Sequence, residues 1–595
     1  MTDRGAVALA LAAVAGAWLR VEVPAVVVAL SAAGTLALGW ARRTAVAVVA
    51  VLLLAVWLGG RAWDGLTPDS AHAGQAIAGT ATLVSDPERL PGGVQVDVSL
   101  GGMRLRAVAP PAAGRLASGA AGERWHVEGR YSPLDAASRA RLASRHIAGR
   151  LRVRAAHRVD GGSPLAVVSN ALRRTLLDGT RSMAPRDRSL FAGVVLGDDR
   201  GQDPTEIEDF RSSGLSHLLA VSGQNVVFLL ALLHPLLARL GLAARFVAVL
   251  AVLGVFGTVT RWEPSVMRAV AMGSIAALAS TLGRQVSPLR VLSLAVTGLV
   301  LIDPLVVLSI GFALSVSACA GLVLLAPLLR RRLAEPLAVT VSAQVAVLPL
   351  LLTVFGPVPL VSVVANLLAA PVAGPLMMWG IAGGFVAGVA GEPMATALHV
   401  PTRVLLGAVR LVARWSASLA VPWITPRVVV VVALAGAAGF VVCRRLHVRP
   451  PRGALAAAGV VALLGVSLMP SRASGAGLDT GGDDALWREG AVVVVVTDAA
   501  APPGRLLGAL RSRRVRAIDV LVVTSGARNA GANLEPVLRR LSPSLVLAPA
   551  ESQVPGAVAI ETAVVVRAGP FSIDLAPDGD RLRPRIGSAR AARPG

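Results

Sequence analysis

Long apolar runs recur along the chain, separated by short polar segments. Many windows of about 17–25 residues carry almost no charge, which is the length a helix needs to cross a bilayer. Three such runs precede residue 61, five lie between residues 214 and 329, and more follow. The pattern predicts a polytopic α-helical membrane protein. The predicted spans are 6–19, 23–40, 44–60, 214–238, 243–260, 264–283, 290–302 and 305–329, with further spans in 336–442 and a last one over 454–469.

Residues 61–163 have a different pattern, in which short stretches alternate apolar and polar positions between Gly-Gly and Pro-Gly breaks. Five short strands in about 100 residues indicate a small β-barrel of the OB type, although the alternation alone fits a sandwich equally well. The expected strands are Ala76–Thr82, Val94–Leu100, Met103–Val108, Trp125–Arg130 and Ile147–Val153.

Residues 164–183 place Leu165, Val168 and Leu172 at helical spacing, with Arg173 and Arg174 among them. This pattern predicts an amphipathic helix. It either lies in the membrane interface or links the preceding domain to the next by packing on it, and the sequence leaves both interpretations open.

The segment after the last span alternates strand-like and helix-like stretches. Ala491–Thr497 and Ile518–Thr524 are apolar runs, whereas Arg505–Leu510 and Leu534–Leu541 have helical patterns. Strand, helix, strand, helix predicts a small α/β domain. From Pro577 onward the sequence is rich in Pro and Arg, and we expect a frayed end.

Charge then orients the spans. Of 595 residues, 54% are hydrophobic and 16% charged, the net charge is +23, and every basic residue is Arg, so a soluble enzyme is disfavoured. Arg-rich loops after residues 238, 283 and 329 alternate with acidic loops at Glu263 and Asp303. The positive-inside rule accounts for much of the charge and places residues 61–213 and the tail outside. Counting spans from the N-terminus independently gives the same answer. The two cysteines, Cys319 and Cys443, form no disulfide framework and no metal motif.

Four segments carry a family resemblance: GLSHLLAVSGQNV (214–226), EPSVMRA (263–269), DPLVVLSIGFALSVSACAGL (303–322) and LPLLLTVFGPVPLVSVVANLLAAP (348–371). In this order and spacing they resemble the competence domain of the ComEC family, the channel proteins of bacterial DNA uptake. The resemblance implies a multi-pass protein of the bacterial cytoplasmic membrane that carries single-stranded DNA during natural transformation. It implies a DNA receptor protein outside, an ATP-driven helicase or translocase inside, a possible homodimer and no cofactor.

The chain thus divides into six predicted parts, which combine a polytopic helical membrane region with an extracytoplasmic OB-like β domain and a C-terminal α/β domain. They are N-terminal transmembrane helices (1–60), the OB-like domain (61–163), an amphipathic helix (164–183), the multi-span competence domain (187–443), a cytoplasmic loop with the last span (444–470) and a degenerate metallo-β-lactamase-like domain (471–595).

The C-terminal part departs from the family pattern. A THxHxDH motif supplies metal ligands in family members with a nuclease-like domain, and Thr524 survives in the matching place. Ser525, Ala527, Asn529 and Ala530 stand where His, His, Asp and His would be, and no His follows His447. Because catalytic zinc needs about three protein ligands, we expect a metal-free remnant without enzymatic activity. Asp519, Glu535, Asp574 and Asp578 remain as carboxylates that would suit Mg²⁺ or Mn²⁺.

Several polar residues stand at the mouth of the span that begins near Gly214. Polar groups there are costly unless they face water or a partner, and Gly223 permits a close backbone approach or local unwinding. On one continuous helix, His217 and Gln224 would share a face. The predicted channel-lining residues are His217, Ser222, Gly223, Gln224 and Asn225. The competing interpretation is helix–helix packing by small and amide residues.

Two residues deeper in the competence domain belong to the same hypothesis. Arg268 either contacts phosphate or extends to the outer interface, and Asn366 either lines the path or joins helices, with packing favoured. In the outer domain a basic face is predicted to bind single-stranded DNA, with two aromatic stackers, against the alternative of a solvated charged surface. Its residues are Arg104, Arg106, Arg124, Trp125, Arg130, Tyr131, Arg150 and Arg152.

Two other functions compete. A secondary transporter of a small solute would need paired ionisable residues at mid-membrane and internal repeats, and neither is evident. An intramembrane hydrolase using Ser222 and His217 is disfavoured, since five positions apart on a helix they would point about 140° away from each other. A Walker A loop needs Lys, which the chain lacks, so a motor has to be another protein.

Overall fold

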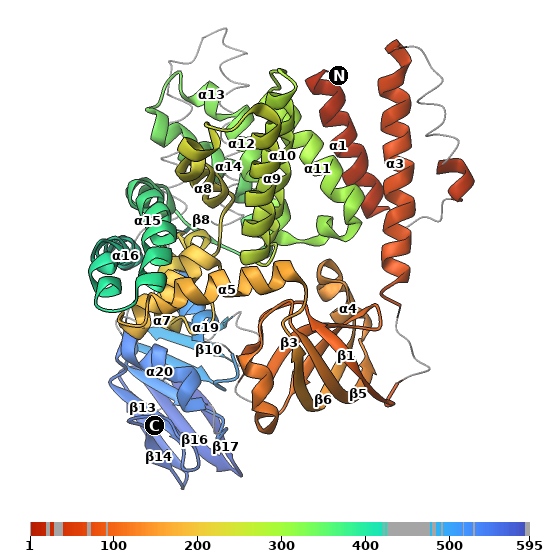
Figure 1. Cartoon of the computed structure of the whole chain (residues 1–595). Helices are drawn as coiled ribbons and strands as arrows, with labels where there is room; N and C mark the ends of the chain where they lie inside the picture. The colour runs from red at the N-terminus through yellow and green to blue at the C-terminus, as the bar shows by residue number, and fades with distance from the viewer. Residues whose placement is uncertain are drawn as a thin grey trace, which may run out of the picture. The chain divides into compact units, whose positions relative to one another are not determined.

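The computed structural model divides into two compact units (Figure 1). The first contains residues 1–201, 217–350 and 366–409, and the second contains residues 202–216, 351–365 and 410–595. The structure describes residues 2–19, 24–28, 40–67, 73–90, 93–419, 423–424, 476–478, 484–489, 492–501, 503–513, 515, 517–527 and 530–588. Of the predicted span 23–40 the structure describes only residues 24–28 and 40, and the loop and last span of 444–470 fall wholly outside the described residues.

Among the described residues, six segments are long and apolar enough to cross a membrane, in agreement with a polytopic membrane protein. They are Thr44–Asp64, Leu242–Val259, Ile310–Leu329, Glu335–Val354, Ser362–Ala390 and Met394–Ser418. The helices of this part are α1 (Asp3–Trp18), α3 (Trp40–Asp64), α8 (Gly223–Leu237), α9 (Leu242–Val259), α10 (Pro264–Thr281), α11 (Pro288–Ile302), α12 (Ile310–Leu324), α13 (Ala326–Leu329), α14 (Glu335–Val354), α15 (Ser362–Ala390) and α16 (Met394–Ser418).

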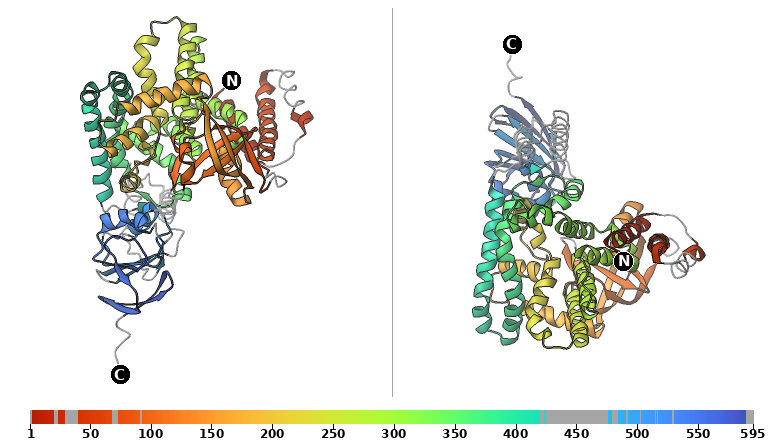
Figure 2. Two further views of the ribbon diagram at one scale, coloured as in Figure 1. Left: turned by 60° about the horizontal axis from the view of Figure 1, so that its bottom comes forward. Right: turned by 90° about the horizontal axis from the view of Figure 1, so that it is seen from above.

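The helices α15 and α16 run side by side (Figure 1 and Figure 2). The Trp379 indole of α15 donates a hydrogen bond of 3.0 Å to the Leu398 carbonyl of α16. Prolines interrupt both helices, at Pro371 and Pro375 in α15 and at Pro401 in α16.

The five strands expected in residues 61–163 are all present, and they close into a barrel. The strand β1 pairs with both β5 and β3, which completes the ring β1-β5-β6-β4-β3. Among the described barrel strands, only β4 and β6 pair in parallel, and the other neighbours are antiparallel. The barrel strands are β1 (Ala76–Leu83), β3 (Gly93–Leu100), β4 (Met103–Ala109), β5 (Arg124–Pro133) and β6 (Ile147–Asp160), with a short edge strand β2 (Glu88–Leu90), a 3-10 segment η2 (Pro111–Ser118) and the small elements α4 (Ala136–Leu142) and η3 (Ala143–Arg145).

The helix α5 (Pro164–Asp178) follows the barrel and packs against α9. Its buried side includes Asn170, Arg173 and Leu176, whereas Leu165 and Val168 are exposed. The predicted helix is present, and its contact with α9 agrees with the interpretation that it packs on the following domain. Arg173 is buried because acidic and carbonyl oxygens surround its guanidinium.

We call Asp86, Asn170, Arg173, Asp198, Arg200 and Arg261 the Asp86 cluster. Asp86, in the barrel, accepts hydrogen bonds from Arg261 at 2.7 and 3.0 Å and from Arg173 at 3.2 Å. Arg173 also donates to the carbonyl of Val259, the last residue of α9, at 2.7 Å. Burial alone would raise the pKa of Asp86, but the charges of Arg173 and Arg261 outweigh it and lower the pKa to about 2. The cluster therefore ties the barrel to α5 and to the loop after α9.

A second contact joins the barrel to another loop of the helical region. The His146 Nε2 atom lies 2.9 Å from an oxygen of Asp303, at the start of η6 (Pro304–Leu308). Beneath it, Leu66, Ala143, Ala148 and Leu305 form a small apolar core. Because the barrel contacts both the Arg261 loop and the Asp303 loop, those two loops lie on its side of the helical region. The alternation of charge predicted this arrangement.

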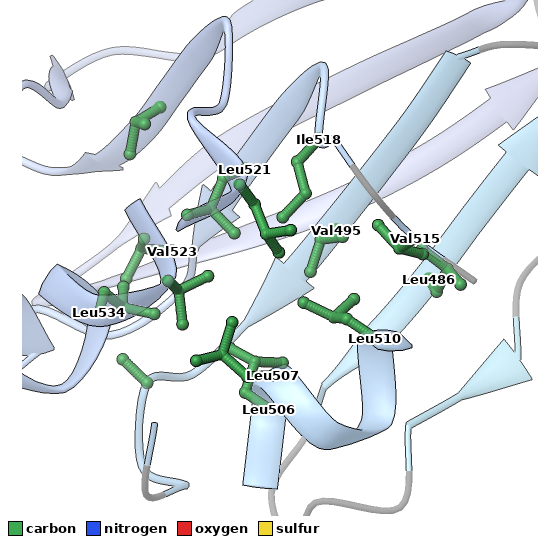
Figure 3. Packing of buried hydrophobic residues seen from close by; sticks show 14 of the residues in the cluster. Leu486, Val495, Leu506, Leu507, Leu510, Val515, Ile518, Leu521, Val523 and Leu534 are labelled. Carbon is green, nitrogen blue, oxygen red and sulfur yellow. The ribbon is translucent and has the colours of Figure 1, made fainter. Parts of the chain in front are cut away.

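The C-terminal domain has three layers, and strand alternation explains them. Residues of one parity, such as Val495, Leu521 and Val523, pack under α19 (Pro503–Ser512) and α20 (Ala530–Leu541) (Figure 3). Residues of the other parity, such as Val494 and Val522, pack against a three-stranded sheet. The six-stranded sheet has the order β14-β13-β12-β11-β10-β9, from β14 (Val558–Ile560), β13 (Leu545–Pro549), β12 (Val520–Val523), β11 (Val492–Thr497), β10 (Ala485–Glu489) and β9 (Ala476–Gly477). The smaller sheet contains β15 (Val564–Ala568), β16 (Phe571–Asp578) and β17 (Arg581–Ser588).

The expected fraying from Pro577 is wrong as far as Ser588, because β16 and β17 pair in register from Phe571↔Ser588 to Asp578↔Arg581. Alternating apolar residues, among them Leu582, are buried against the central sheet and hold this hairpin in place.

The helix α7 (Pro204–Ser213) belongs to the same compact unit as the C-terminal domain and packs against α19 and α20. Asp209 forms an ion pair with Arg540 of α20, and Glu206 accepts a hydrogen bond of 2.6 Å from Arg410. Since α7 contacts the C-terminal domain directly, both lie on one side of the membrane. The remaining short elements are α6 (Pro185–Phe191), the π-helical turn η4 (Ala192–Leu196), η5 (Ser216–Leu218) and the bridge between β7 (Val358–Pro359) and β8 (Trp423–Ile424).

We predict that Asp86→Asn lowers the free energy of unfolding by about 3 kcal/mol at pH 7, because it leaves the Arg173 and Arg261 charges close together without their acceptor. Thermal unfolding of the purified protein in detergent measures the effect. Because the pKa of Asp86 is lowered to about 2, its contribution is present above its ordinary value of 3.8 and is lost as the pH falls toward 2.

The matched control is Asp160→Asn, which breaks an exposed ion pair with Arg124 in the same barrel and should change the melting temperature little. Adding Arg261→Gln to Asp86→Asn should recover part of the loss, since it removes one uncompensated charge. Equal melting temperatures for Asp86→Asn and the wild type would contradict the role of the cluster.

Candidate functional site

The polar segment 214–226 is not one helix. The helix α7 ends at Gly214, whose φ of +76° suits glycine, and Ser216–Leu218 form a separate 3-10 turn. The chain then runs to Ser222, and α8 begins only at Gly223. The predicted span that began at residue 214 is therefore wrong at its start. The helical angles inferred between His217, Ser222 and Gln224 do not apply.

The first turn of α8 has no side-chain cap. Ser222 occupies the N-cap position, but its hydroxyl donates a hydrogen bond to Asn225 Oδ1 at 3.1 Å and accepts none from the helix. The amide of Asn225 in turn donates to the carbonyl of Val194 at 3.4 Å. The peptide N–H groups at the start of α8 thus keep the partial positive charge of a helix N-terminus.

Arg268 lies on α10 and reaches the start of α8. Its side chain is largely buried, with 8% of the residue exposed, so it does not extend to the outer interface. The Nε atom donates to Ser315 of α12 at 2.6 Å, and Nη1 lies 3.3 Å from the sulfur of Met272. A Cβ on Gly223 would lie only 2.4 Å from Nη2, so glycine is what allows the guanidinium to sit there. No carboxylate in the described part of the chain forms an ion pair with Arg268.

The other candidate channel residues are distributed around this point. His217 and Gln224 are exposed, and Asn225 is buried. The bond from Asn225 to Val194 favours the packing interpretation for Asn225. Asn366 is half-buried near the start of α15. Eight residues further along, Gly374 lies against the ring of Phe228 of α8, so α15 and α8 are packed neighbours.

Ser222 and His217 do not form a nucleophile–base pair. The Ser222 hydroxyl donates to Asn225, and His217 lies on the separate turn. This arrangement gives the hydrolase hypothesis no support.

A basic face covers one side of the barrel. Arg130, Arg150 and Arg152 are exposed, and the register places Arg152 opposite Arg130 and Arg150 opposite Ser132 across β5 and β6. Since paired residues share a face, the arginines of neighbouring strands project together. On β4, Arg106 lies opposite Arg150 and is held by Asp97 at 2.9 Å, and Arg104 is exposed. Of the predicted arginines, Arg104, Arg130, Arg150 and Arg152 are exposed, whereas Arg124 pairs with Asp160.

The two predicted aromatic stackers are wrong for this face. Trp125 is 3% and Tyr131 1% exposed, and both belong to the barrel core. The Trp125 indole donates to Glu123 at 3.1 Å, and the Tyr131 ring packs on Gly149. The sequence could have predicted this burial. Trp125 and Tyr131 are separated from the apolar Val127 by even numbers of residues along β5, and alternate residues of a strand share one face.

The end of β12, where metal ligands would follow, is covered by the β16–β17 turn. Leu582 donates its backbone N–H to Thr524 at 2.9 Å, and Gly526 donates to Asp580 at 2.7 Å. Asp519 stands at the opposite end of β12 and accepts from the backbone of Val493 at 2.7 Å. Among the described residues there is no group of three or more His, Cys, Asp or Glu that could hold a metal ion. Asn529 lies outside them.

The membrane-capable helices, the barrel and the α/β domain define a polytopic membrane protein with two folded domains outside its helices. Residues 194–448 match the family model described as Competence protein. The chain is also similar to ComE operon protein 3 of Bacillus subtilis (strain 168), with 28% identity over 148 residues, or 24% of this chain and 19% of that protein. The match therefore spans about a fifth of the relative's length. No solved structure matches the chain. These similarities support a competence-type family.

Proposed function

We propose that this protein is a channel in the bacterial cytoplasmic membrane that carries single-stranded DNA inward during natural transformation. The similarity of residues 194–448 to the Competence protein family is the main support. The six membrane-capable segments and the basic barrel face agree with it. The cargo carries one negative charge per nucleotide, so its path has to be wide, wet and mildly positive.

The barrel is proposed to be of the OB type and to receive the DNA. Five strands closed as β1-β5-β6-β4-β3 agree with that architecture. Arg104, Arg130, Arg150 and Arg152 supply an electrostatic surface for the phosphates. With Trp125 and Tyr131 in the core, binding would depend on charge, have little sequence preference and weaken steeply with salt.

The path through the membrane is proposed to pass the start of α8, where the exposed His217 and Gln224 lie near the uncapped helix end. Because the chain has no Lys, a Walker A loop is excluded, and energy has to come from a separate ATP-driven helicase or translocase. A DNA receptor protein on the outer side would deliver the substrate, and a homodimer is compatible with this scheme.

The C-terminal domain is proposed to be a degenerate metallo-β-lactamase-like domain without catalysis. Its strands β11 and β12 and helices α19 and α20 follow the expected order, but Ser525 and Ala527 replace imidazole ligands. The β16–β17 turn pairs with the chain directly after β12. A catalytic zinc would need about three protein ligands and an open position for water, and this region is proposed to offer neither.

We predict that deletion of the protein abolishes entry of DNase-protected labelled DNA into the cytoplasm, and that the wild-type chain restores it. The double variant His217→Leu/Gln224→Leu should fail to restore entry while reaching the normal protein level, since both side chains are exposed and the change favours membrane insertion. Val227→Leu, exposed one position beyond the first α8 turn, is the control and should restore entry. Normal entry in the deletion strain would refute the channel proposal and reopen the solute-transporter alternative.

We expect the barrel and the C-terminal domain to share the outer side of the membrane. In a background with Cys319 and Cys443 replaced by Ala, Ser118→Cys and Ala550→Cys should each react with an impermeant thiol reagent in intact cells, because both positions are exposed. Arg331→Cys, in the loop after α13, should react only after permeabilisation. Protection of Ser118→Cys or Ala550→Cys would contradict this orientation.

The purified full-length protein should contain no stoichiometric zinc by elemental analysis and should not nick plasmid DNA with Mg²⁺ or Mn²⁺. The remaining carboxylates do not converge, since Asp519 binds backbone, Glu535 pairs with Arg539 and Asp578 pairs with Arg583. Nicking that Asp519→Asn abolishes would mean that the domain is an enzyme.

A further inference from the structure

Arg268 poses an electrostatic problem that the described protein atoms leave unsolved. A guanidinium stays charged under all ordinary conditions, and burying it is costly unless an anion compensates it. In the Asp86 cluster, by contrast, the buried Arg173 and Arg261 each have a carboxylate oxygen within 3.2 Å. Arg268 has only a hydroxyl, at 2.6 Å, and a thioether, at 3.3 Å. Among the described residues, no hydrogen bond is formed by its Nη2 atom.

The surroundings make the imbalance larger. Nη2 lies against Gly223, the first residue of α8, and α8 is 15 residues long. The positive end of a helix dipole and a guanidinium repel each other in a medium of low polarity. Ser222, which could have reduced the positive charge by capping, gives its hydroxyl to Asn225. The two positive groups are stable together if an anion lies between or beside them.

We propose that Arg268 and the uncapped first turn of α8 form a binding site for one phosphodiester group of the transported strand. Two kinds of donor would serve it: the Nη2 side of the guanidinium, which lies against Gly223, and the peptide N–H groups at the uncapped helix start. This combination suits a tetrahedral oxyanion. It reads no base, which agrees with transport of any sequence.

The site would act as a stepping point. One phosphate replaces the missing counterion of Arg268, and the next phosphate displaces it as the strand advances. Gly223 is the residue that keeps the site open, because a Cβ there would push the guanidinium aside. Ser315 is a positioning residue, since its hydroxyl fixes the Nε side of the guanidinium and leaves the Nη2 side free.

This inference rests on the proposed channel function, and its test separates the two. Uptake of DNase-protected label is measured in the deletion strain carrying the wild type, Arg268→Gln, Arg268→Lys or Gly223→Ala, at matched protein levels. We expect uptake to fall at least tenfold with Arg268→Gln and Gly223→Ala, and less with Arg268→Lys, which keeps the charge. Arg239→Gln, which removes an exposed arginine after the other end of α8, should leave uptake unchanged.

A binding measurement identifies the ligand. The full-length protein in phosphatidylcholine nanodiscs is titrated with a fluorescent oligothymidine carrying either normal phosphodiesters or uncharged methylphosphonates. Arg268→Gln should weaken binding of the phosphodiester strand about tenfold and lower its salt slope by about 0.7, the value for one phosphate contact on a single strand. It should leave the weak binding of the methylphosphonate strand unchanged.

The outcomes are distinct. If the wild-type chain restores no uptake, the channel function itself fails. If the wild type restores uptake and both Arg268→Gln and Gly223→Ala match it, the channel stands and the phosphate site is wrong. Should Arg268→Gln not accumulate in the membrane, Gly223→Ala decides, because it retains every charge. A phospholipid that native mass spectrometry finds on the wild type and not on Arg268→Gln, together with unchanged oligonucleotide binding, would assign the site to lipid and overturn the proposal.

Discussion

The Asp86 cluster is the constraint on which the arrangement of the first unit depends. Its members come from four separated segments: a barrel loop, α5, the turn after η4 and the loop after α9. Each buried charge needs its partners, so none of these segments can move away without exposing or orphaning another. Arg173 also closes the end of α9 by binding the Val259 carbonyl. These contacts attach the barrel to the loops between the helices. In the helical region itself, Arg268 of α10 lies against Gly223 at the start of α8.

Arg268 is also a buried charge that needs a compensating partner, but no carboxylate among the described residues pairs with it. In the Asp86 cluster, arginines and carboxylates nearly balance within the protein, and the consequence is a rigid joint. At the start of α8, a buried arginine meets a glycine and an uncapped helix, and the described residues supply no balancing charge. In the Asp86 cluster the opposite charges satisfy each other, whereas we infer that the charge of Arg268 is available to an anion. This contrast distinguishes the arginines of the Asp86 cluster from Arg268, which we connect with transport.

The C-terminal domain is held together by apolar packing on both faces of its central sheet. The central sheet buries both faces, one under α19 and α20 and the other against the β15–β17 sheet. The apolar layers on both faces of the sheet therefore stabilise the domain. The ion pair of Asp209 with Arg540 then ties this domain to α7, the helix that immediately precedes the polar segment leading into α8.

The sequence by itself determined the elements whose pattern is strong over many residues. Continuous apolar runs located most of the membrane-capable helices and the tail strands β11 and β12, and alternation located the five barrel strands, because these patterns depend on local order. Tertiary structure decided the rest. Arg173 is buried because carboxylates from distant segments reach it, the side chain of Asn225 at the start of α8 binds the distant Val194 carbonyl, and β17 is held because the central sheet covers it. Such outcomes depend on partners remote in the chain, and no local pattern contains them.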